Sequence, residues 1–259
     1  MTTAGLDPLA AFRVDDRVAI VTGATSGLGE RFARVLAAAG ASVIVAGRRA
    51  DRLGRLAAEI HGVAVPGDLA DPDAPAALVD AALARHGRVD ILVNNAGISH
   101  IESALTEPSD EYRRELAVDL VAPFELSRLV ARSIIERGGA GSIVNVASVW
   151  GLVGVGQIPD AGYAAAKGGL VNLTRELAAQ WARQGVRVNV IAPAFFRTEM
   201  TDERMFQDER ARIWMGRRTP MGRGGEEHEL DGALLFLASP ASSYVTGAVV
   251  PVDGGWTAV

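Results

Sequence analysis

The chain has 259 residues, of which 49% are hydrophobic and 29 are glycine, and its 26 basic and 31 acidic side chains give a net charge of -5. This composition is typical of a globular protein with one large core and excludes a disordered or fibrous chain. The acidic balance provides no basic face for nucleic acid, and the lack of cysteine excludes disulfides, thiolate nucleophiles and zinc–cysteine sites.

Short apolar runs rich in β-branched residues alternate along the chain with stretches that carry apolar residues at helical spacing. We predict strands at 17–22, 42–46, 63–65, 90–93, 142–147, 187–191 and 248–252. We predict helices at 27–39, 51–60, 74–86, 109–136, 161–183 and 226–237. This alternation predicts an α/β fold, a doubly wound (Rossmann) domain with a parallel seven-stranded sheet and helices on both faces.

No linker or repeat divides this series, so we expect a single domain over residues 1–259. One stretch, 194–225, is irregular and mixes charges with apolar residues such as Met205, Ile213 and Trp214. It is either a surface helix with one apolar face or a lid that covers a substrate.

Thr22–Gly29 (TGATSGLG) lies between the first strand and the first helix. Glycines in such a turn let the backbone approach a pyrophosphate, and the following helix N-terminus contributes unpaired N–H groups. The segment therefore predicts a dinucleotide site.

Further motifs follow in order, and together with this turn they resemble the short-chain dehydrogenase/reductase family. The resemblance runs from about Val18 to Trp256, and it rests on the segments Asn94–Gly97 (NNAG), Ser148, Tyr163–Lys167 (YxxxK), Pro193–Thr198 and Val252–Gly255 (VDGG).

Tyr163 and Lys167 are four residues apart and therefore project from one face of a helix. A nearby ammonium lowers the pKa of a phenol, so Tyr163 can exchange a proton with a substrate while Lys167 holds it in range. Lys167 is the only lysine in a chain that otherwise uses arginine, which supports a specific role. The resemblance implies that Ser148 donates a hydrogen bond to the reacting carbonyl oxygen. Without the resemblance, a serine at the end of a strand is often only a turn residue.

The chain departs from the family pattern at two positions. Asp119, within Val118–Leu120, stands where the family has an asparagine in a V-N-L segment, and Ala194 stands where the family has glycine. The resemblance implies that the main chain at this position helps to hold a water that links the lysine to solvent, and we expect Asp119 to keep this role. Its carboxylate favours the charged form of Lys167, or it ties up the ammonium and weakens the proton relay; we expect the relay to survive. We expect the change at Ala194 to alter only local backbone shape.

The second strand ends in Ala46-Gly47-Arg48-Arg49, without the acidic residue that binds the ribose of NAD. Arginine suits a 2'-phosphate, so we expect NADP rather than NAD, although NAD stays possible in so arginine-rich a chain. By the resemblance, Asp68 and Leu69 contact adenine. The predicted cofactor-binding residues are Gly23, Thr25, Ser26, Leu28, Gly29, Arg48, Arg49, Asp68, Leu69, Asn95, Ala96, Gly97, Tyr163, Lys167, Pro193, Phe196 and Thr198.

We therefore predict an NAD(P)(H)-dependent oxidoreductase that interconverts a secondary alcohol and a ketone, with Ser148, Tyr163, Lys167 and Asp119 at the catalytic site. The C-terminal segments are similar both to 3-oxoacyl carrier-protein reductases and to gluconate or polyol dehydrogenases. A mostly apolar lining around His100, 152–158 and 194–214 would fit acyl, steroid or aromatic ketones better than a sugar. A non-catalytic dinucleotide-binding sensor or scaffold is the alternative.

We expect no metal site, because the histidines (His61, His86, His100 and His228) lack ligand spacing. We also expect a cytoplasmic protein without nucleic-acid or membrane partners, because residues 1–11 lack signal-peptide features and no apolar run reaches the ~20 residues of a membrane span. By analogy with the family, we expect a homotetramer.

Overall fold

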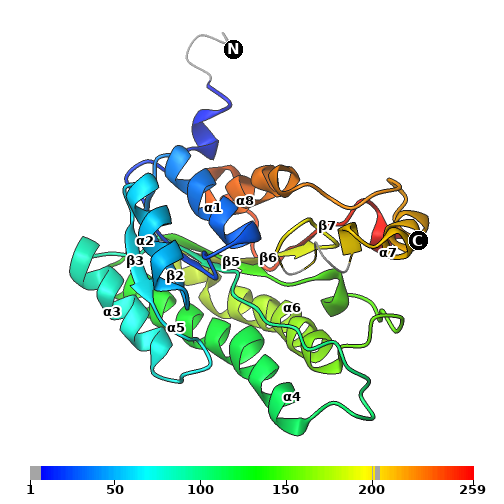
Figure 1. Cartoon of the computed structure of the whole chain (residues 1–259). Helices are drawn as coiled ribbons and strands as arrows, with labels where there is room; N and C mark the ends of the chain where they lie inside the picture. Colours follow the sequence, from blue (N-terminus) through cyan, green and yellow to red (C-terminus); the bar gives the residue numbers. More distant parts are fainter. Residues whose placement is uncertain (1–6, 200, 202–204) are drawn as a thin grey trace.

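Seven parallel strands in the order β3-β2-β1-β4-β5-β6-β7 form the centre of the molecule (Figure 1). The computed structural model describes residues 7–199, 201 and 205–259. The strands are β1 (Val18–Thr22), β2 (Ser42–Gly47), β3 (Val63–Pro66), β4 (Ile91–Asn94), β5 (Gly141–Val146), β6 (Val186–Pro193) and β7 (Val249–Val252). Strands β2 and β3 are added on one side of β1, and β4 to β7 are added on the other side. The loops that follow β1 and β4 therefore lead to opposite faces of the sheet and leave a crevice between them.

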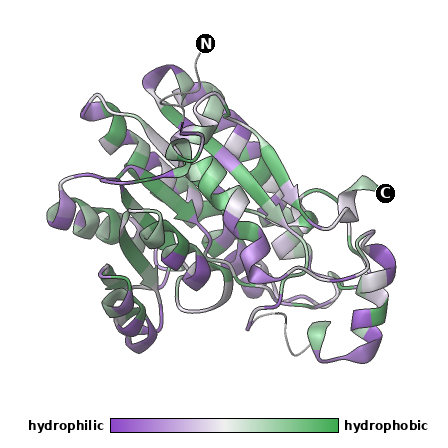
Figure 2. Ribbon diagram, turned by 90° about the horizontal axis from the view of Figure 1, so that it is seen from above, coloured by the Kyte–Doolittle hydropathy of each residue, from purple (hydrophilic) through white to green (hydrophobic). Residues whose placement is uncertain are grey.

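Helices cover both faces of the sheet because the strands are apolar on both sides (Figure 2). One face carries α1 (Gly27–Ala38), α2 (Ala50–Glu59) and α8 (Asp231–Ala238). The opposite face carries α3 (Ala74–His86), α5 (Ala122–Glu136) and α6 (Ala161–Trp181). These layers bury two separate clusters of apolar side chains, one on each side of the sheet. The predicted fold class is confirmed.

The helix predicted at 109–136 is interrupted. It consists of α4 (Ser109–Leu116), a π-helical turn (Ala117–Val121) and α5, and α4 extends beyond the sheet to pack against α6 (Figure 1). Hydrophobic spacing cannot distinguish a π turn from an α turn within one continuous helix, so the sequence pattern missed it. Asp119 lies in this turn, and π turns are frequent at functional sites.

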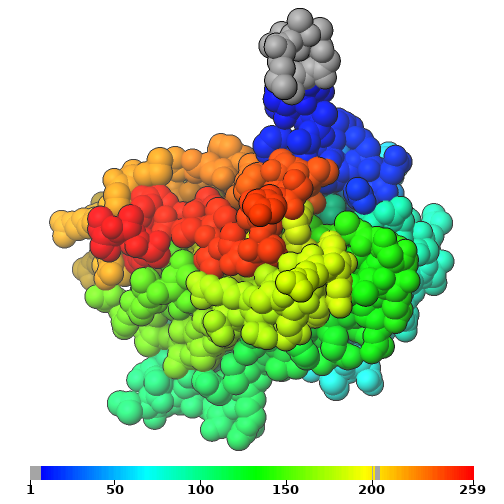
Figure 3. All heavy atoms as spheres, turned by 180° about the vertical axis from the view of Figure 1, so that it is seen from behind, coloured from blue at the N-terminus to red at the C-terminus, as the bar shows by residue number. Residues whose placement is uncertain are grey.

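The irregular stretch 194–225 contains α7 (Glu209–Arg218), which the sequence analysis considered but did not assign. The helix predicted at 226–237 begins as a 3-10 turn (Glu227–Leu230), closed by a reciprocal pair of hydrogen bonds between Glu226 and Glu229, before α8. Seen from behind, the C-terminal segment lies against the part of the chain that contains α8, and its strand β7 pairs with β6 (Figure 3). Within the ranges described, no helix combines the length and apolarity needed to cross a bilayer.

Candidate active site

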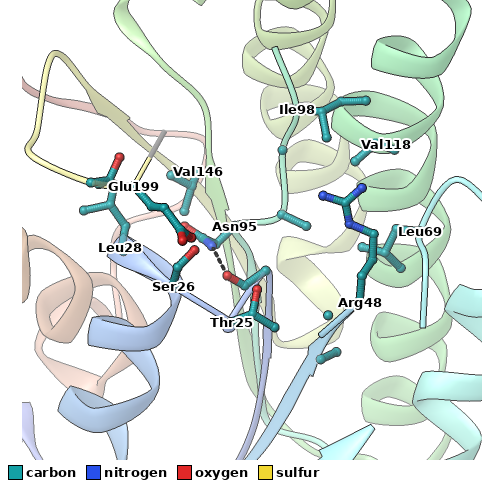
Figure 4. Close-up of a pocket in the computed structure, with 18 of the residues that line it drawn as sticks. Thr25, Ser26, Leu28, Arg48, Leu69, Asn95, Ile98, Val118, Val146 and Glu199 are labelled. Carbon is teal, nitrogen blue, oxygen red and sulfur yellow. Dashed lines mark hydrogen bonds between the residues drawn. The ribbon is translucent and has the colours of Figure 1, made fainter. Parts of the chain in front are cut away.

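A pocket of about 510 Å³ opens at the carboxyl ends of the central strands (Figure 4). Every residue that we predicted to bind the cofactor lines it, as does Ser148. The pocket thus brings together segments from Gly23 to Thr198 that the sequence separates by more than half of the chain. Asp119 does not line the pocket and lies behind Lys167, fully buried.

The glycine-rich turn packs closely against neighbouring segments of the chain. Gly23 adopts φ = 67°, and a Cβ there would come within 2.8 Å of the Cα of Ala96. Gly27, at φ = 53°, begins α1 and would press a Cβ against Thr198. Both positions therefore require glycine, and the turn with the N-terminus of α1 lines the pocket.

Polar side chains connect β1 to β4 at the floor of the pocket. The Thr22 hydroxyl accepts hydrogen bonds from the backbone N–H groups of Asn95 (3.1 Å) and Ala96 (3.0 Å). The Asn95 amide donates in return to the Thr22 carbonyl oxygen at 2.9 Å. These bonds hold the Asn94–Gly97 segment, and with it one wall of the pocket, in place.

The two adjacent arginines at the end of β2 differ in their contacts. Arg49 donates hydrogen bonds to the hydroxyls of Thr25 and Ser26 and forms an ion pair with Glu199 at 2.8 Å. Arg48 makes no hydrogen bond or ion pair with any described residue, and its side chain extends into the pocket toward Val118 (Figure 4). Arg48 is therefore the guanidinium available for an anionic group.

Three side chains with acid–base or hydrogen-bonding capacity meet at the opposite end of the pocket. Ser148 follows β5, is 6% exposed and accepts a hydrogen bond from the backbone N–H of Trp150. Tyr163 lies in the first turn of α6, where its backbone N–H is capped by the Asp160 carboxylate at 3.1 Å. Lys167, one turn later, places its Nζ 5.3 Å from the centre of the Tyr163 ring.

The Lys167 ammonium is buried and held by two oxygens. It donates to the Val146 carbonyl oxygen at 3.1 Å and pairs with the Asp119 carboxylate at 3.1 Å. Asp119 also accepts a hydrogen bond from the backbone N–H of Ile98 at 2.9 Å. Gly97 packs directly on this ion pair, since a Cβ there would lie 2.8 Å from the Asp119 oxygen.

Burial and charge act on the pKa values of these groups in opposite directions. Burial raises the pKa of Tyr163 above that of a free phenol; Lys167 and a hydrogen bond from Ser148 lower it in part, and Asp119 adds to the increase. Lys167 thus lowers this pKa as expected, but desolvation outweighs the ammonium and the net pKa is raised. Burial alone would lower the pKa of Lys167, but Asp119 and Tyr163 outweigh that effect and raise it.

Several pocket residues were not among the predicted ones. Glu199 pairs with both Arg49 and Arg52, which lower its pKa to about 2, and Ile98 and Val118 contribute apolar walls. Glu199 directly follows the Pro193–Thr198 segment, and that position was the one sequence signal for its role. The ion pairs themselves join residues about 150 positions apart, which no local pattern reveals.

The apolar residues of 194–225 mostly contact one another. Phe195, Met205, Phe206, Met215 and Trp256 are buried in a separate cluster, together with Val149 and Val155. Of the apolar side chains in this stretch, Ala194 and Phe196 line the pocket. This stretch therefore contributes few apolar side chains to the pocket, and a mostly apolar substrate lining stays a prediction. Met200 lies outside the described residues.

Known proteins that resemble this chain match it over almost its full length. A family model described as enoyl-(acyl carrier protein) reductase matches residues 23–257. Galactitol 2-dehydrogenase (L-tagatose-forming) of Cereibacter sphaeroides is 43% identical over 254 residues, which cover 97% of this chain and 99% of that protein.

Solved structures agree with this match. The crystal structure of a gluconate 5-dehydrogenase from Burkholderia cenocepacia in complex with NADP and tartrate has a TM-score of 0.92 and 37% identity, and the alignment covers 98% of this chain and 100% of that one. A short-chain type dehydrogenase/reductase from Mycobacterium marinum has a TM-score of 0.91 and 33% identity, with 97% and 99% covered. Because relatives of this identity share both the fold and nearly the entire length, the chain belongs to the short-chain dehydrogenase/reductase family.

Proposed function

We propose that the protein is an NADP(H)-dependent oxidoreductase that interconverts a secondary alcohol and a ketone. The observation that carries this proposal is that Ser148, Tyr163 and Lys167 line the same pocket as the glycine-rich turn. This arrangement can hold a dinucleotide at one end and polarise a carbonyl group at the other.

The pocket residues fit a dinucleotide. Backbone N–H groups after Gly23 and the N-terminus of α1 would hold the pyrophosphate, because the glycines there leave room for close approach. Arg48 would hold a 2'-phosphate, since its guanidinium has no partner among the described residues. The gluconate 5-dehydrogenase with 37% identity was crystallised with NADP, which supports this choice. When bound, NADPH supplies the hydride and NADP⁺ accepts it.

Tyr163 transfers the proton in this mechanism. During reduction its hydroxyl donates a proton to the substrate oxygen, while Ser148 donates a hydrogen bond to the same oxygen as negative charge develops. The raised pKa of Tyr163 keeps the phenol protonated at neutral pH, which suits the reductive direction. In the oxidative direction Tyr163 must act as the phenolate, so we expect oxidation to accelerate as the pH rises.

For the substrate we propose a polyol or sugar acid. The relative with 43% identity is a galactitol dehydrogenase, and the apolar residues that would suit an acyl or aromatic ketone are mostly buried in their own cluster. A panel containing galactitol, gluconate, cyclic ketones and 3-oxoacyl thioesters, each with NADP(H) and NAD(H), tests both choices. Turnover of thioesters alone would contradict the proposed class.

Tyr163→Phe tests the reaction itself. We expect this variant to bind NADPH as the wild type does and to lose at least about 100-fold in kcat, because it lacks the transferred proton. Fluorescence titration measures binding, and absorbance at the NADPH band measures turnover. Cofactor binding without turnover of any panel member, unchanged in Tyr163→Phe, would favour the non-catalytic sensor instead.

The assembly and the location stay predictions. We propose a homotetramer, in which α4, α5 and α6 and the C-terminal segment form the interfaces, and exposed apolar side chains such as Val121 and Tyr244 support contacts on these faces. Light scattering tests the tetramer, and a monomer would refute it. Cell fractionation tests the cytoplasmic location.

A further inference from the structure

Three carboxylates that the proposed reaction does not use meet beside the first turn of α6. They are Glu107 from the loop before α4, Glu115 near the end of α4, and Asp160 at the N-cap of α6. One oxygen of each lies within 4.8 Å of the others. Two neighbouring segments around α4 and the distant start of α6 therefore place negative charge in one small volume.

Glu115 and Asp160 are buried, Glu107 is half-buried, and the cluster has no cationic partner among the described residues. Glu115 is 0% exposed and Asp160 is 6% exposed. None of the ion pairs among described residues involves any of the three carboxylates. Buried carboxylates are normally paired with a cation or coordinate a metal, so this arrangement needs a compensating charge.

Two of the buried oxygens have no hydrogen-bond partner. Glu115 uses Oε1 to accept from the backbone N–H of His100, but its Oε2 is unpartnered, as is Oε1 of Glu107. Both unpartnered oxygens are directed at the same point, since a Cβ on Gly162 would collide with Oε2 of Glu115 and lie 2.9 Å from Oε1 of Glu107. An unpartnered buried oxygen is costly, and here two of them converge.

We propose that Glu107, Glu115 and Asp160 form a binding site for a divalent cation of the Ca²⁺ type. Carboxylate oxygens are the ligands that Ca²⁺ prefers, and three carboxylates exceed the charge of one divalent ion. Oxygens that lie within 4.8 Å of one another can contact one ion, and Ca²⁺ accepts such a set readily because its coordination geometry is flexible. No histidine belongs to this cluster, and the chain has no cysteine.

The ion would act on the start of the helix that carries Tyr163 and Lys167. Asp160 accepts a hydrogen bond from the backbone N–H of Tyr163 with one oxygen and from the Ser99 hydroxyl with the other. An ion that joins Asp160 to Glu115 would fix the first turn of α6 against α4. The site is therefore structural and lies outside the pocket, since none of its three ligands lines the pocket.

A bound proton is the competing way to neutralise the cluster. Burial, followed by the repulsion from Asp160, Glu107 and Asp119, raises the pKa of Glu115 to about 8 although the His100 N–H opposes the change. A proton and a cation therefore compete for the same oxygens, because a carboxylate must lose its proton to bind a metal.

The experiment uses the full chain, stripped with EDTA and transferred to chelator-free buffer at pH 8. Binding of Mn²⁺ is measured by electron paramagnetic resonance and of Ca²⁺ by calorimetry, and thermal unfolding is followed with CaCl₂, MgCl₂ or KCl at equal ionic strength. We expect one ion per chain and, at about 100 times Kd, a rise in Tm of roughly 5 °C with Ca²⁺. KCl should have no comparable effect.

Glu115→Gln keeps the shape of the side chain and should abolish both the binding and the Tm increase. Glu107→Gln, at a less buried position, gives the same test if Glu115→Gln folds poorly. Asp110→Asn is the matched control, because Asp110 lies on α4 with its side chain 96% exposed and should leave binding unchanged. These measurements do not depend on turnover, so they stand apart from the proposed reaction.

Two results would overturn the proposal. One is the absence of Mn²⁺ and Ca²⁺ binding to the wild type, or equal binding to Glu115→Gln. The other is a wild-type Tm that does not change with any of the ions but falls as the pH rises from 5 to 8. In this case the Tm of Glu115→Gln would not fall over the same pH range. The second result would assign the cluster to a shared proton.

Discussion

Lys167 combines a buried charge with a buried counter-charge. Its side chain is 4% exposed and that of Asp119 is 0% exposed, so neither charge is screened by water. The ammonium lowers the pKa of Tyr163 and the carboxylate raises it, and desolvation exceeds both. Asp119 therefore makes Tyr163 a weaker acid while keeping Lys167 charged.

Asp119→Asn removes the repulsion between the carboxylate and the phenolate. We expect the alkaline limb of the oxidation rate against pH to move to lower pH, because the pKa of Tyr163 falls, and the plateau rate to change less than about tenfold. Stopped-flow rates between pH 6 and 10.5 measure this. A shift to higher pH would mean that Asp119 acts mainly by keeping Lys167 protonated.

Arg48 is the second residue whose contacts allow a sharp test. We expect Arg48→Gln to weaken NADP binding roughly 10- to 100-fold through the loss of charge-assisted hydrogen bonds, and to leave NAD binding nearly unchanged. Calorimetric titration with each cofactor measures the difference. The control is Arg55→Gln on α2, whose side chain is 75% exposed. Equal losses for NAD and NADP would contradict a contact with the 2'-phosphate.

At the scale of elements, α4 and α6 pack closely because α6 begins with small residues. Gly162 has no side chain at the point where α6 meets Glu115 and Glu107. Gly168 lies further along the same helix, and a Cβ there would meet only the Gly151 carbonyl oxygen, at 3.9 Å. The same helix thus holds one glycine that packing requires and one that it does not.

These two glycines give opposite predictions. We expect Gly162→Ala to lower the free energy of unfolding by about 1–3 kcal/mol, because the new methyl group overlaps a buried carboxylate. We expect Gly168→Ala to raise it by up to about 1 kcal/mol through helix propensity. Urea unfolding in EDTA measures both. Stabilisation of similar size in both variants would show that Glu115 moves aside freely.

At the scale of the whole molecule, the C-terminal segment anchors the stretch 194–225 to the sheet. The Trp256 ring lies 5.2 Å from that of Phe195 and 5.4 Å from that of Trp214, centre to centre, and the Arg218 guanidinium lies 5.0 Å above it. These contacts hold α7 against the C-terminal segment, and its role as a lid stays a prediction.

Trp256→Ala should release α7 without disturbing the central strands. We expect amide exchange in residues 209–218 to accelerate at least about tenfold, while β1 and β4 keep their protection, because the removed ring belongs to the cluster around Phe195 and to neither cluster of the sheet. Hydrogen exchange with mass spectrometry measures this. Leu9→Ala, at an apolar residue that is 72% exposed, is the control. Faster exchange in β1 would show that the cluster supports the whole sheet.

Local patterns predicted much of this protein. The strands at 18–22 and 42–47 differ from their predicted bounds by one residue, because continuous apolar runs bounded by glycine leave few alternatives. The π turn at Asp119 was missed, because recognising it needs hydrogen-bond geometry. A surface helix was one of two interpretations of 194–225, and the weak apolar stripe of α7 did not decide between them.

The sequence by itself determined the alternation of strands and helices, the glycine turn before α1, and the placement of Tyr163 and Lys167 on one helix face, because each depends on residues a few positions apart. Only the tertiary structure decided which charges meet. Asp119 pairs with Lys167, Glu199 pairs with Arg49, and Glu107 and Glu115 approach Asp160. Such contacts depend on how helices and loops pack across the sheet, and the strength of each depends on burial, which exists only in the folded chain.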